Sequence, residues 1–201
     1  MWLWPRHYPA GRVAVPDGTR PAGAPAAAVR ENVRVPTPYR ICLVCLGNIC
    51  RSPMAAAVLR EQLGEAGLAA AVEVDSAGTG AWHVGHGADR RARAALKARG
   101  YAERHTARQF DAAWFAQRDL VLAMDTANLR ELRRLAPDPD TAARVRLLLS
   151  YDPGAGPDLD VPDPYYGGRD GFEHVLDLLE RACAGLVAEL GRTLAAEGGT
   201  R

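Results

Sequence analysis

Two residues whose types can carry out phosphoryl transfer, Cys45 and Arg51, lie six positions apart in the chain. Cys45 ends a short apolar segment, and Arg51 begins a stretch of helix-forming residues. A cysteine thiolate can attack phosphorus, and the planar fork of an arginine can bind two phosphate oxygens. This spacing predicts a cysteine nucleophile at the floor of a site for a phosphate dianion.

The residues between them are suited to a loop that surrounds an anion. Gly47 permits a positive φ angle, and Asn48 is the residue type that, after glycine, best tolerates the left-handed region. Pro53 suits the first turn of a following helix, where its missing N–H costs nothing. Such a loop aims backbone N–H groups at one point, and the helix N-terminus adds its positive end. The expected phosphate contacts are Leu46, Gly47, Asn48, Ile49 and Cys50.

The same surroundings favour the thiolate of Cys45. A free thiol is only a few per cent ionised at neutral pH, and a helix N-terminus beside an arginine favours its ionised form. Ser52 can donate its hydroxyl proton to the sulfur. The structural alternative is an ordinary strand-to-helix turn that happens to contain two cysteines. The Gly, Asn, Ser and Pro residues at fitting positions argue against that alternative.

The elements that must position this loop alternate between strand and helix. Strand-like segments occur at 40–45, 72–76, 119–124 and 145–149. The first is a short apolar run typical of a buried strand, and 72–76 alternates between apolar and polar residues. Helix-forming stretches occur at 54–66, 89–99, 126–135 and 172–190. This alternation predicts an α/β fold, an open four-stranded parallel sheet that is doubly wound like flavodoxin. Ligand sites in such sheets lie past the carboxyl ends of the strands, so the loops after the strands should converge.

The composition changes along the chain and sets the domain boundaries. Seven prolines lie among the first 39 residues, and no helical or strand periodicity survives them. We expect 1–39 to be a disordered Pro/Ala/Gly-rich extension, 40–192 to form the domain and 193–201 to be a flexible tail. A docking role of the extension through Trp2 and Trp4 is the functional alternative.

The charge balance and the apolar patterning limit the partners. The chain has 25 basic and 24 acidic residues, which disfavours nucleic acid as a partner. No apolar run is long enough to span a membrane, and no signal peptide is apparent. The four cysteines do not form a secreted disulfide framework, which indicates a reducing compartment. We expect a cytoplasmic monomer; secretion without a signal peptide stays open.

The segment from Cys45 to Pro53, Cys-Leu-Gly-Asn-Ile-Cys-Arg-Ser-Pro, resembles the signature of the low-molecular-weight protein tyrosine phosphatases. Further matches follow in order at 75–83, 104–110 and 160–167, and the likeness is greatest to the actinobacterial-type members. The resemblance implies hydrolysis of aryl phosphate monoesters, in particular phosphotyrosine in proteins or peptides. It implies a phosphocysteine intermediate on Cys45, with neither a metal nor another cofactor.

The general acid is identified by this resemblance. Asp-Pro dipeptides are ordinary turn formers, and they occur at Asp138, Asp152 and Asp163, so the dipeptide alone discriminates poorly. Asp163 matches the family's acid, which protonates the leaving phenolate oxygen and then activates water. Pro162 and Pro164 stiffen its loop and fix the carboxyl group, as general acid catalysis requires.

The resemblance also implies the walls of the site and the residues beneath it. Trp82, Tyr165 and Tyr166 match aromatic residues that form a slot deep enough for an aryl phosphate. A tyrosine kinase that acts on the two tyrosines is an implied partner. Ser76 and His105 match positions that hold the loop from below, together with the asparagine and the serine of the signature.

The remaining cysteines have different expected roles. Cys42 and Cys45 form a Cys-x-x-Cys pair, but residues three apart in a strand are about 10 Å distant, too far for a disulfide. Cys42 is therefore expected to be a buried apolar residue, and Cys183 is expected to lie in a helix core. The resemblance implies that Cys50 forms a reversible disulfide with Cys45 that protects it from over-oxidation.

Two alternative functions compete with this one. A thiol-linked arsenate reductase shares the fold but needs further cysteines in a mobile segment, and none lies between Cys50 and Cys183. A catalytically inactive phosphotyrosine-binding module is disfavoured by the joint presence of a cysteine, an arginine and an aspartate at the matching positions. His83 and His86 have a metal-ligand spacing, but no third ligand is evident nearby.

Overall fold

The computed structural model describes residues 37–198 of the chain. The expected extension 1–39 lies almost entirely outside the described residues, as do residues 199–201 at the end of the expected tail. The expected domain, 40–192, lies wholly within them.

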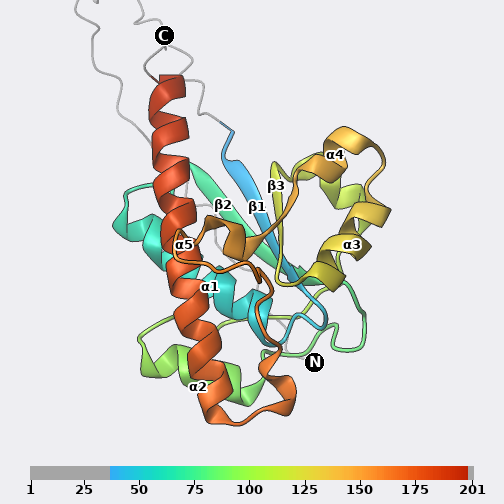
Figure 1. Ribbon diagram of the computed structural model, residues 1–201, viewed down its shortest axis with the longest axis vertical. Coiled ribbons are helices and arrows are strands. Elements are labelled where there is room, and N and C mark those ends of the chain that lie inside the picture. Colours follow the sequence, from blue (N-terminus) through green and yellow to red (C-terminus); the bar gives the residue numbers. More distant parts are fainter. Residues whose placement is uncertain (1–36, 199–201) are drawn as a thin grey trace, which may run out of the picture. The chain divides into compact units, whose positions relative to one another are not determined.

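A four-stranded parallel sheet forms the centre of the domain (Figure 1). Its strands are β1 (Tyr39–Cys45), β2 (Val72–Gly78), β3 (Leu120–Ala123) and β4 (Val145–Leu147). Their order in the sheet is β2-β1-β3-β4, and every pair is parallel. The predicted α/β fold is confirmed. Because β1 lies between two neighbours and is covered on both faces, its sequence is apolar without alternation.

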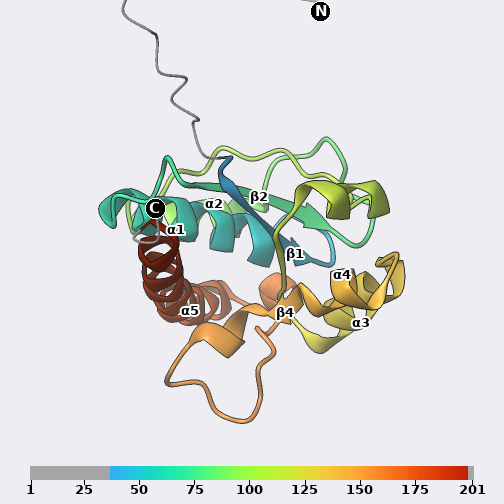
Figure 2. The ribbon, with the colours of Figure 1, turned by 90° about the horizontal axis from the view of Figure 1, so that it is seen from above.

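Five α-helices accompany the strands in the described residues. They are α1 (Arg51–Glu65), α2 (Arg90–Ala98), α3 (Thr126–Leu135), α4 (Pro139–Ala143) and α5 (Arg169–Gly198). Short 3₁₀ segments occur at Ala112–Gln117, Leu148–Tyr151 and Pro164–Tyr166. In Figures 1 and 2, α1, α2 and α5 lie together in one group, and α3 and α4 lie together in another.

The two faces of β1 contribute to two separate hydrophobic clusters. Ile41, Leu43 and Cys45 belong to the cluster that α1 and α5 cover. Cys42 and Val44 point the other way, into the cluster that α3 and the segment around Phe115 complete. Successive side chains of a strand alternate between faces, so residues three apart lie on opposite sides of the sheet. Cys42 is fully buried and all four cysteines are free, in line with its expected role as an apolar residue.

Helix α5 continues further than the sequence suggested. The expected domain ended at residue 192, whereas the helix extends to Gly198, so the expected tail is helical over 193–198. Leu190 is buried, and Leu194, one helical turn later, packs against the same core. The apolar spacing thus holds the helix beyond the expected boundary. In the described residues, we find no helix with a stretch both apolar and long enough to cross a bilayer.

Candidate active site

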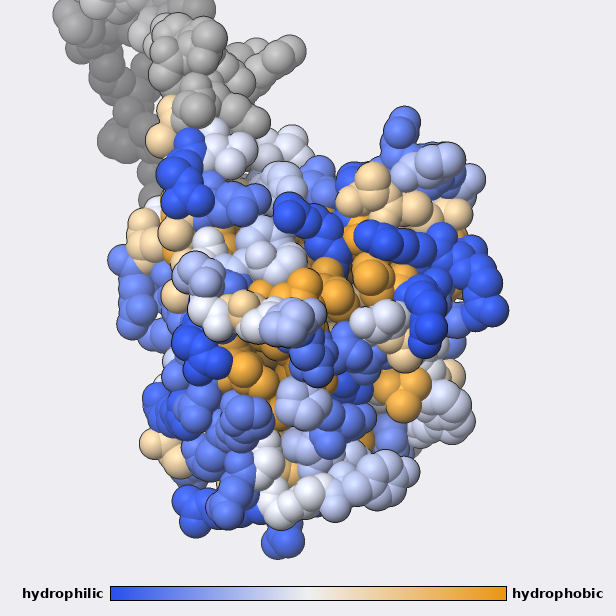
Figure 3. All heavy atoms as spheres, viewed as in Figure 1, coloured by the Kyte–Doolittle hydropathy of each residue, from blue (hydrophilic) through white to orange (hydrophobic). Residues whose placement is uncertain are grey.

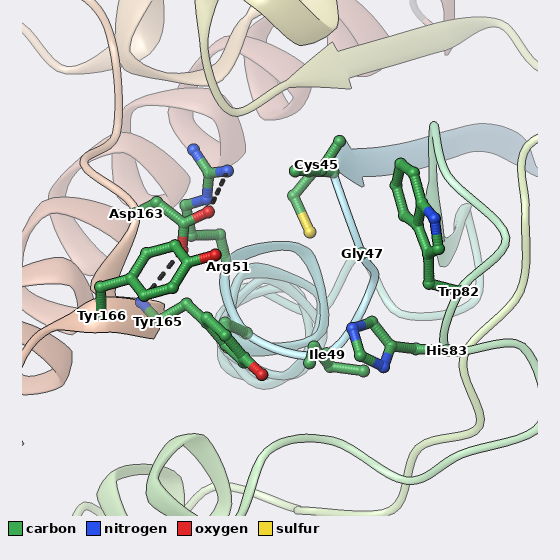
Figure 4. A pocket seen from close by; sticks show the side chains of 11 residues that line it. Cys45, Gly47, Ile49, Arg51, Trp82, His83, Asp163, Tyr165 and Tyr166 are labelled. Atoms are coloured by element: carbon green, nitrogen blue, oxygen red, sulfur yellow. Dashed lines mark hydrogen bonds and ion pairs between the residues drawn. The ribbon is translucent and has the colours of Figure 1, made fainter.

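Three loops at the carboxyl ends of the strands line one pocket of about 320 Å³ (Figure 4). The pocket is lined by Cys45, Leu46, Gly47, Ile49, Cys50, Arg51, Trp82, His83, Asp163, Tyr165 and Tyr166. The loop between β1 and α1 forms its floor. The loop after β2 supplies Trp82 and His83, and the segment before α5 supplies the aspartate and the tyrosines. The expected convergence of the strand-end loops therefore occurs, and it brings together residues far apart in the sequence.

Asn48 holds the floor loop in its curled form. It is fully buried, and its φ angle of 54° lies in the left-handed region. Its side-chain Nδ2 donates to Ser52 Oγ at 2.9 Å and to Ser76 Oγ at 3.1 Å. Its Oδ1 accepts from the backbone N–H of Arg108 at 2.8 Å. These bonds fix a backbone conformation that most residues avoid.

The sulfur of Cys45 lies at the floor and is contacted by two polar groups. The backbone N–H of Asn48 donates to Sγ at 3.2 Å, and Ser52 Oγ lies 3.1 Å from it. The Ser52 hydroxyl also lies 3.1 Å from the carbonyl oxygen of Ala77. A hydroxyl has one proton, so Ser52 donates either to that carbonyl or to the sulfur. A thiolate at Cys45 accepts that proton as a charge-assisted hydrogen bond.

The side chain of Arg51 is only 4% exposed, and three acceptors hold its guanidinium group in place. Its Nη1 donates to Asp125 Oδ2 at 2.6 Å and to the carbonyl oxygen of Val161 at 3.0 Å. Its Nη2 donates to Asp163 Oδ2 at 3.0 Å. A guanidinium has five N–H donors, so two remain without a partner among the described residues and are available to an anion.

Asp125 has a role in the site that the sequence did not reveal. It caps the N-terminus of α3, because its Oδ1 accepts from the backbone N–H of Asn128 at 2.7 Å. Its other oxygen fixes Arg51. An aspartate before a helix is a visible capping signal, but nothing in the sequence connects that cap to an arginine 74 residues earlier. Convergence of the strand-end loops is the one signal that could have pointed to it.

The carboxyl group of Asp163 lies at the edge of the pocket. Its Oδ1 accepts from the backbone N–H of Tyr165 at 3.1 Å, and its Oδ2 accepts from Arg51. The side chain is 39% exposed, so it can reach both the pocket and the solvent. Flanking prolines and these two donors orient the carboxyl group.

Aromatic side chains form the rim. In Figure 4, Tyr165 and Tyr166 lie on one side of the pocket, and Trp82 and His83 lie on the other. Trp82 is 71% exposed and Tyr166 is 94% exposed, while Tyr165 is less exposed. From the sequence, His83 was considered only as a metal ligand, and its place on the pocket wall was missed.

The residues expected beneath the loop are brought together. His105 Nε2 donates to the carbonyl oxygen of Asn48 at 2.6 Å; a carbonyl can only accept, which places a proton on Nε2. Burial lowers the pKa of His105, against the smaller opposing effect of that hydrogen bond. Ser76 is buried and accepts from the Asn48 side chain. Both residues support the loop without lining the pocket.

The other thiols differ in their surroundings. Burial, together with the nearby Asp89, raises the pKa of Cys50 to about 12. Burial also raises the pKa of Cys42 and of Cys183 well above the ordinary range. These three cysteines are therefore neutral thiols at physiological pH. Cys50 is the one among them that lines the pocket.

Comparison with known proteins gives a consistent result. Residues 40–196 match the family model described as low molecular weight phosphotyrosine protein phosphatase. A low molecular weight protein-tyrosine-phosphatase of Streptomyces coelicolor is 62% identical over 151 residues, which are 75% of this chain and 92% of that protein. Low molecular weight protein-tyrosine phosphatase A of Mycobacterium tuberculosis is 47% identical over 162 residues, 80% of this chain and 97% of that protein.

Solved structures agree with the sequence comparisons. The crystal structure of a protein tyrosine phosphatase from Entamoeba histolytica, with Hepes in its active site, superposes with a TM-score of 0.74. The two are 37% identical in sequence, and the match covers 77% of this chain and 98% of that one.

Proposed function

The chain belongs to the low-molecular-weight phosphotyrosine protein phosphatase family and is a protein-tyrosine phosphatase, and we propose that its reaction passes through a phosphocysteine formed at Cys45. The observation that supports this most directly is the surroundings of the sulfur. It lies at the floor of a pocket, within hydrogen-bond distance of Asn48 N and Ser52 Oγ. Arg51 and Asp163 line the same pocket.

In the first step, the Cys45 thiolate attacks the phosphorus of the substrate. An S–P bond forms, and the bond between phosphorus and the phenolic oxygen breaks. Ser52 stabilises the thiolate by donating its hydroxyl proton, and the free N–H donors of Arg51 bind two equatorial phosphate oxygens. The backbone N–H groups of 46–50, apart from that of Asn48, which donates to the sulfur, and the N-terminus of α1 bind the rest of the dianion.

Asp163 moves the proton in both steps. Its carboxyl group protonates the leaving phenolate oxygen, which departs as a neutral tyrosine hydroxyl. The resulting carboxylate then takes a proton from a water molecule that attacks the phosphorus. The S–P bond breaks, inorganic phosphate leaves, and the Cys45 thiolate is restored.

The rim explains a preference for aryl phosphates. The pocket places the sulfur at its floor and aromatic side chains at its mouth, so a phenyl ring spans the depth between them. Trp82 and Tyr165 offer faces on which such a ring packs. A seryl phosphate is shorter, and its main chain meets the rim before its phosphate reaches Arg51.

Hydrolysis of p-nitrophenyl phosphate in the presence of EDTA tests the proposal. We expect turnover in EDTA, no turnover above background for Cys45→Ser, and a loss of about 10²–10⁴ in kcat for Asp163→Asn. Asp138→Asn is the matched control, because Asp138 also precedes a proline but caps α4. Absence of turnover by the unmodified chain, or full activity of Cys45→Ser, would contradict the mechanism.

The same assay separates the alternatives. A catalytically inactive binding module would retain the pocket but would not release p-nitrophenol. A thiol-linked arsenate reductase would consume reducing equivalents in a thioredoxin-coupled assay. The buried Cys183 lies on α5, in the core that covers β1, and therefore lacks the mobility which that chemistry needs.

We further propose the partners and the location of the enzyme. Its substrates are phosphotyrosine proteins, and a tyrosine kinase acts on the rim tyrosines, of which Tyr166 is almost fully exposed. The enzyme acts as a monomer in the cytoplasm. Size-exclusion chromatography with light scattering tests the oligomeric state, and mass spectrometry of the native protein tests phosphorylation at Tyr165 and Tyr166.

A further inference from the structure

A second hollow, of about 480 Å³, lies between the first turns of α2 and α5. The residues that line it include two small ones of α2, Ala94 and Ala95, and Phe172 of α5. Because alanine side chains fill little space between the two helices, a cavity remains there. Its walls carry three guanidinium groups, those of Arg90, Arg91 and Arg169, and one carboxylate, that of Glu173.

The charges of this hollow do not cancel. Glu173 is paired with Arg99 at 3.0 Å, outside the hollow, and Arg91 is paired with Asp89 at 3.0 Å. Arg90 and Arg169 are exposed, and neither forms an ion pair within residues 37–198. Two arginines that line the hollow therefore have no ion-pair partner among the described residues, which favours an anionic ligand.

The first turn of α5 also carries an acidic residue, Asp170, which is exposed but does not line the hollow. The N-terminal ends of two helices lie at this place and add to the positive potential. Figure 3 shows mainly hydrophilic residues on the visible face at the end of the domain where α2 and the beginning of α5 lie.

Arg91, which lines the hollow, contacts a residue that lines the active-site pocket. The guanidinium carbon of Arg91 lies 5.6 Å from the centre of the Tyr165 ring and 4.8 Å from the centre of the Phe172 ring. Tyr165 lines the active-site pocket, whereas Phe172 lines the hollow. Arg91 also donates to the carbonyl oxygen of Gly167 at 3.1 Å, which holds it in this position. A peptide bound with its phosphotyrosine in the pocket therefore passes close to the hollow.

We propose that the hollow binds an anionic side chain of the protein substrate next to the phosphotyrosine, either a carboxylate or a second phosphate. This inference rests on the proposed function, since it assumes that a phosphotyrosine peptide occupies the pocket. Arg90 and Arg169 bind the anion, and Arg91 separates it from the aryl ring. The enzyme thereby selects phosphotyrosine sites in acidic sequences.

Three phosphotyrosine peptides of equal length test the proposal. The first carries glutamates on both sides of the phosphotyrosine, the second carries glutamines there, and the third carries a second phosphotyrosine. The measured quantity is the ratio of kcat/KM for an anionic peptide to that for the glutamine peptide. This ratio does not depend on the fraction of folded enzyme, because both peptides are measured on the same preparation.

The double variant Arg90→Gln/Arg169→Gln removes the two unpaired charges. The matched control, Arg93→Gln/Lys97→Gln, removes two charges from exposed positions of α2 that do not line the hollow. We expect the unmodified enzyme to prefer an anionic peptide by about 3- to 10-fold, as two exposed ion pairs allow. The ratio should approach one in the first variant and should stay unchanged in the control. Raising NaCl from about 0.05 M to about 0.5 M should also reduce it.

The outcomes separate the two proposals. Equal ratios in the unmodified enzyme and in the first variant, or equal losses in both variants, overturn the anion site. The glutamate and phosphotyrosine peptides distinguish the two sources of the anion, and a response of either supports the site. Failure of the unmodified enzyme to hydrolyse p-nitrophenyl phosphate would instead overturn the proposed function.

Discussion

At the scale of single residues, the floor loop is supported by a partly buried imidazole. His105 donates to the backbone carbonyl of Asn48, whose left-handed conformation shapes the phosphate site. Burial lowers the pKa of His105 below 6.5 in the folded protein. The unfolded chain therefore binds more protons than the folded protein as the pH falls below about 6.5. Stability from this group is complete above that pH and is lost as the pH falls towards the folded pKa.

The variant His105→Asn removes this titration and should flatten the dependence of stability on pH. The free energy of unfolding of the unmodified enzyme should fall as the pH drops below about 6.5, with an extra slope of at most about 1.4 kcal/mol per pH unit. Urea denaturation at a series of pH values measures this slope. His174→Asn, at an exposed position of α5, is the matched control and should keep the original slope. Equal slopes for all three proteins would refute the linkage.

Cys50 gives a redox prediction at the same scale. Its pKa, raised to about 12 by burial, keeps it a thiol, so peroxide oxidises the Cys45 thiolate first. The sulfenic acid formed on Cys45 condenses with the Cys50 thiol to a disulfide and releases water. After peroxide treatment, we expect dithiothreitol to restore most activity in the unmodified enzyme and much less in Cys50→Ser. Cys42→Ala, on the opposite face of the sheet, should recover like the unmodified enzyme; equal recovery of all three would exclude the protective disulfide.

The sequence indicated the residues of the proposed chemistry more readily than the residues that hold them in place. Types and spacing suffice for the cysteine and arginine of the floor loop, because their roles depend on a continuous segment. Asp163, the proposed general acid, could be chosen among three Asp-Pro dipeptides only by resemblance to a family. Asp125 was missed because its contact with Arg51 joins the ends of two different strands.

At the scale of elements, α5 packs so closely against the 3₁₀ segment Leu148–Tyr151 that only glycine fits at position 185. A Cβ atom at Gly185 would lie 1.8 Å from the backbone carbonyl oxygen of Tyr151. Backbone atoms cannot move aside as a flexible side chain can, so Gly185→Ala should lower the free energy of unfolding by about 3 kcal/mol. Gly191→Ala in the same helix meets only Leu68 Cδ1, at 3.9 Å, and should be neutral or stabilising by up to about 1 kcal/mol. Thermal or urea unfolding of the two variants measures the difference; similar stabilities would show that α5 can shift.

The long elements were predicted from periodicity, and the short ones were not. Helices α2 and α3 lie within one residue of their predicted ranges, and α5 contains its predicted range but extends beyond it at both ends. Each repeats apolar or small residues at helical spacing. Helix α4, with 5 residues, completes too few turns to show a period. The fourth strand was expected to reach residue 149 but ends at Leu147, where a 3₁₀ segment takes over. Helix α1 begins at Arg51 rather than at residue 54, so that the arginine lies in the first turn beside the sulfur.

At the scale of the described domain, alternation of strands and helices predicted the fold class but not the strand order. The alternation requires parallel strands with helical crossovers, whichever strand occupies the centre. The placement of β1 between β2 and β3 depends on pairing across the sheet. The arginine-lined hollow was equally invisible, because it forms only where two helices distant in the sequence come together. Properties of this kind depend on tertiary contacts.

Arg51 and Asp163 are joined by an ion pair across 112 positions of the chain, and α5, which follows Asp163, packs in the same core as α1. During synthesis, the chain therefore contains Cys45, its proposed nucleophile, long before it contains Asp163, its proposed proton donor. A truncated product that ends before Asp163 would carry the cysteine and the arginine of the floor loop without the proposed proton donor. Turnover by such a product should therefore fall at least as far as in Asp163→Asn, because it lacks the same carboxyl group.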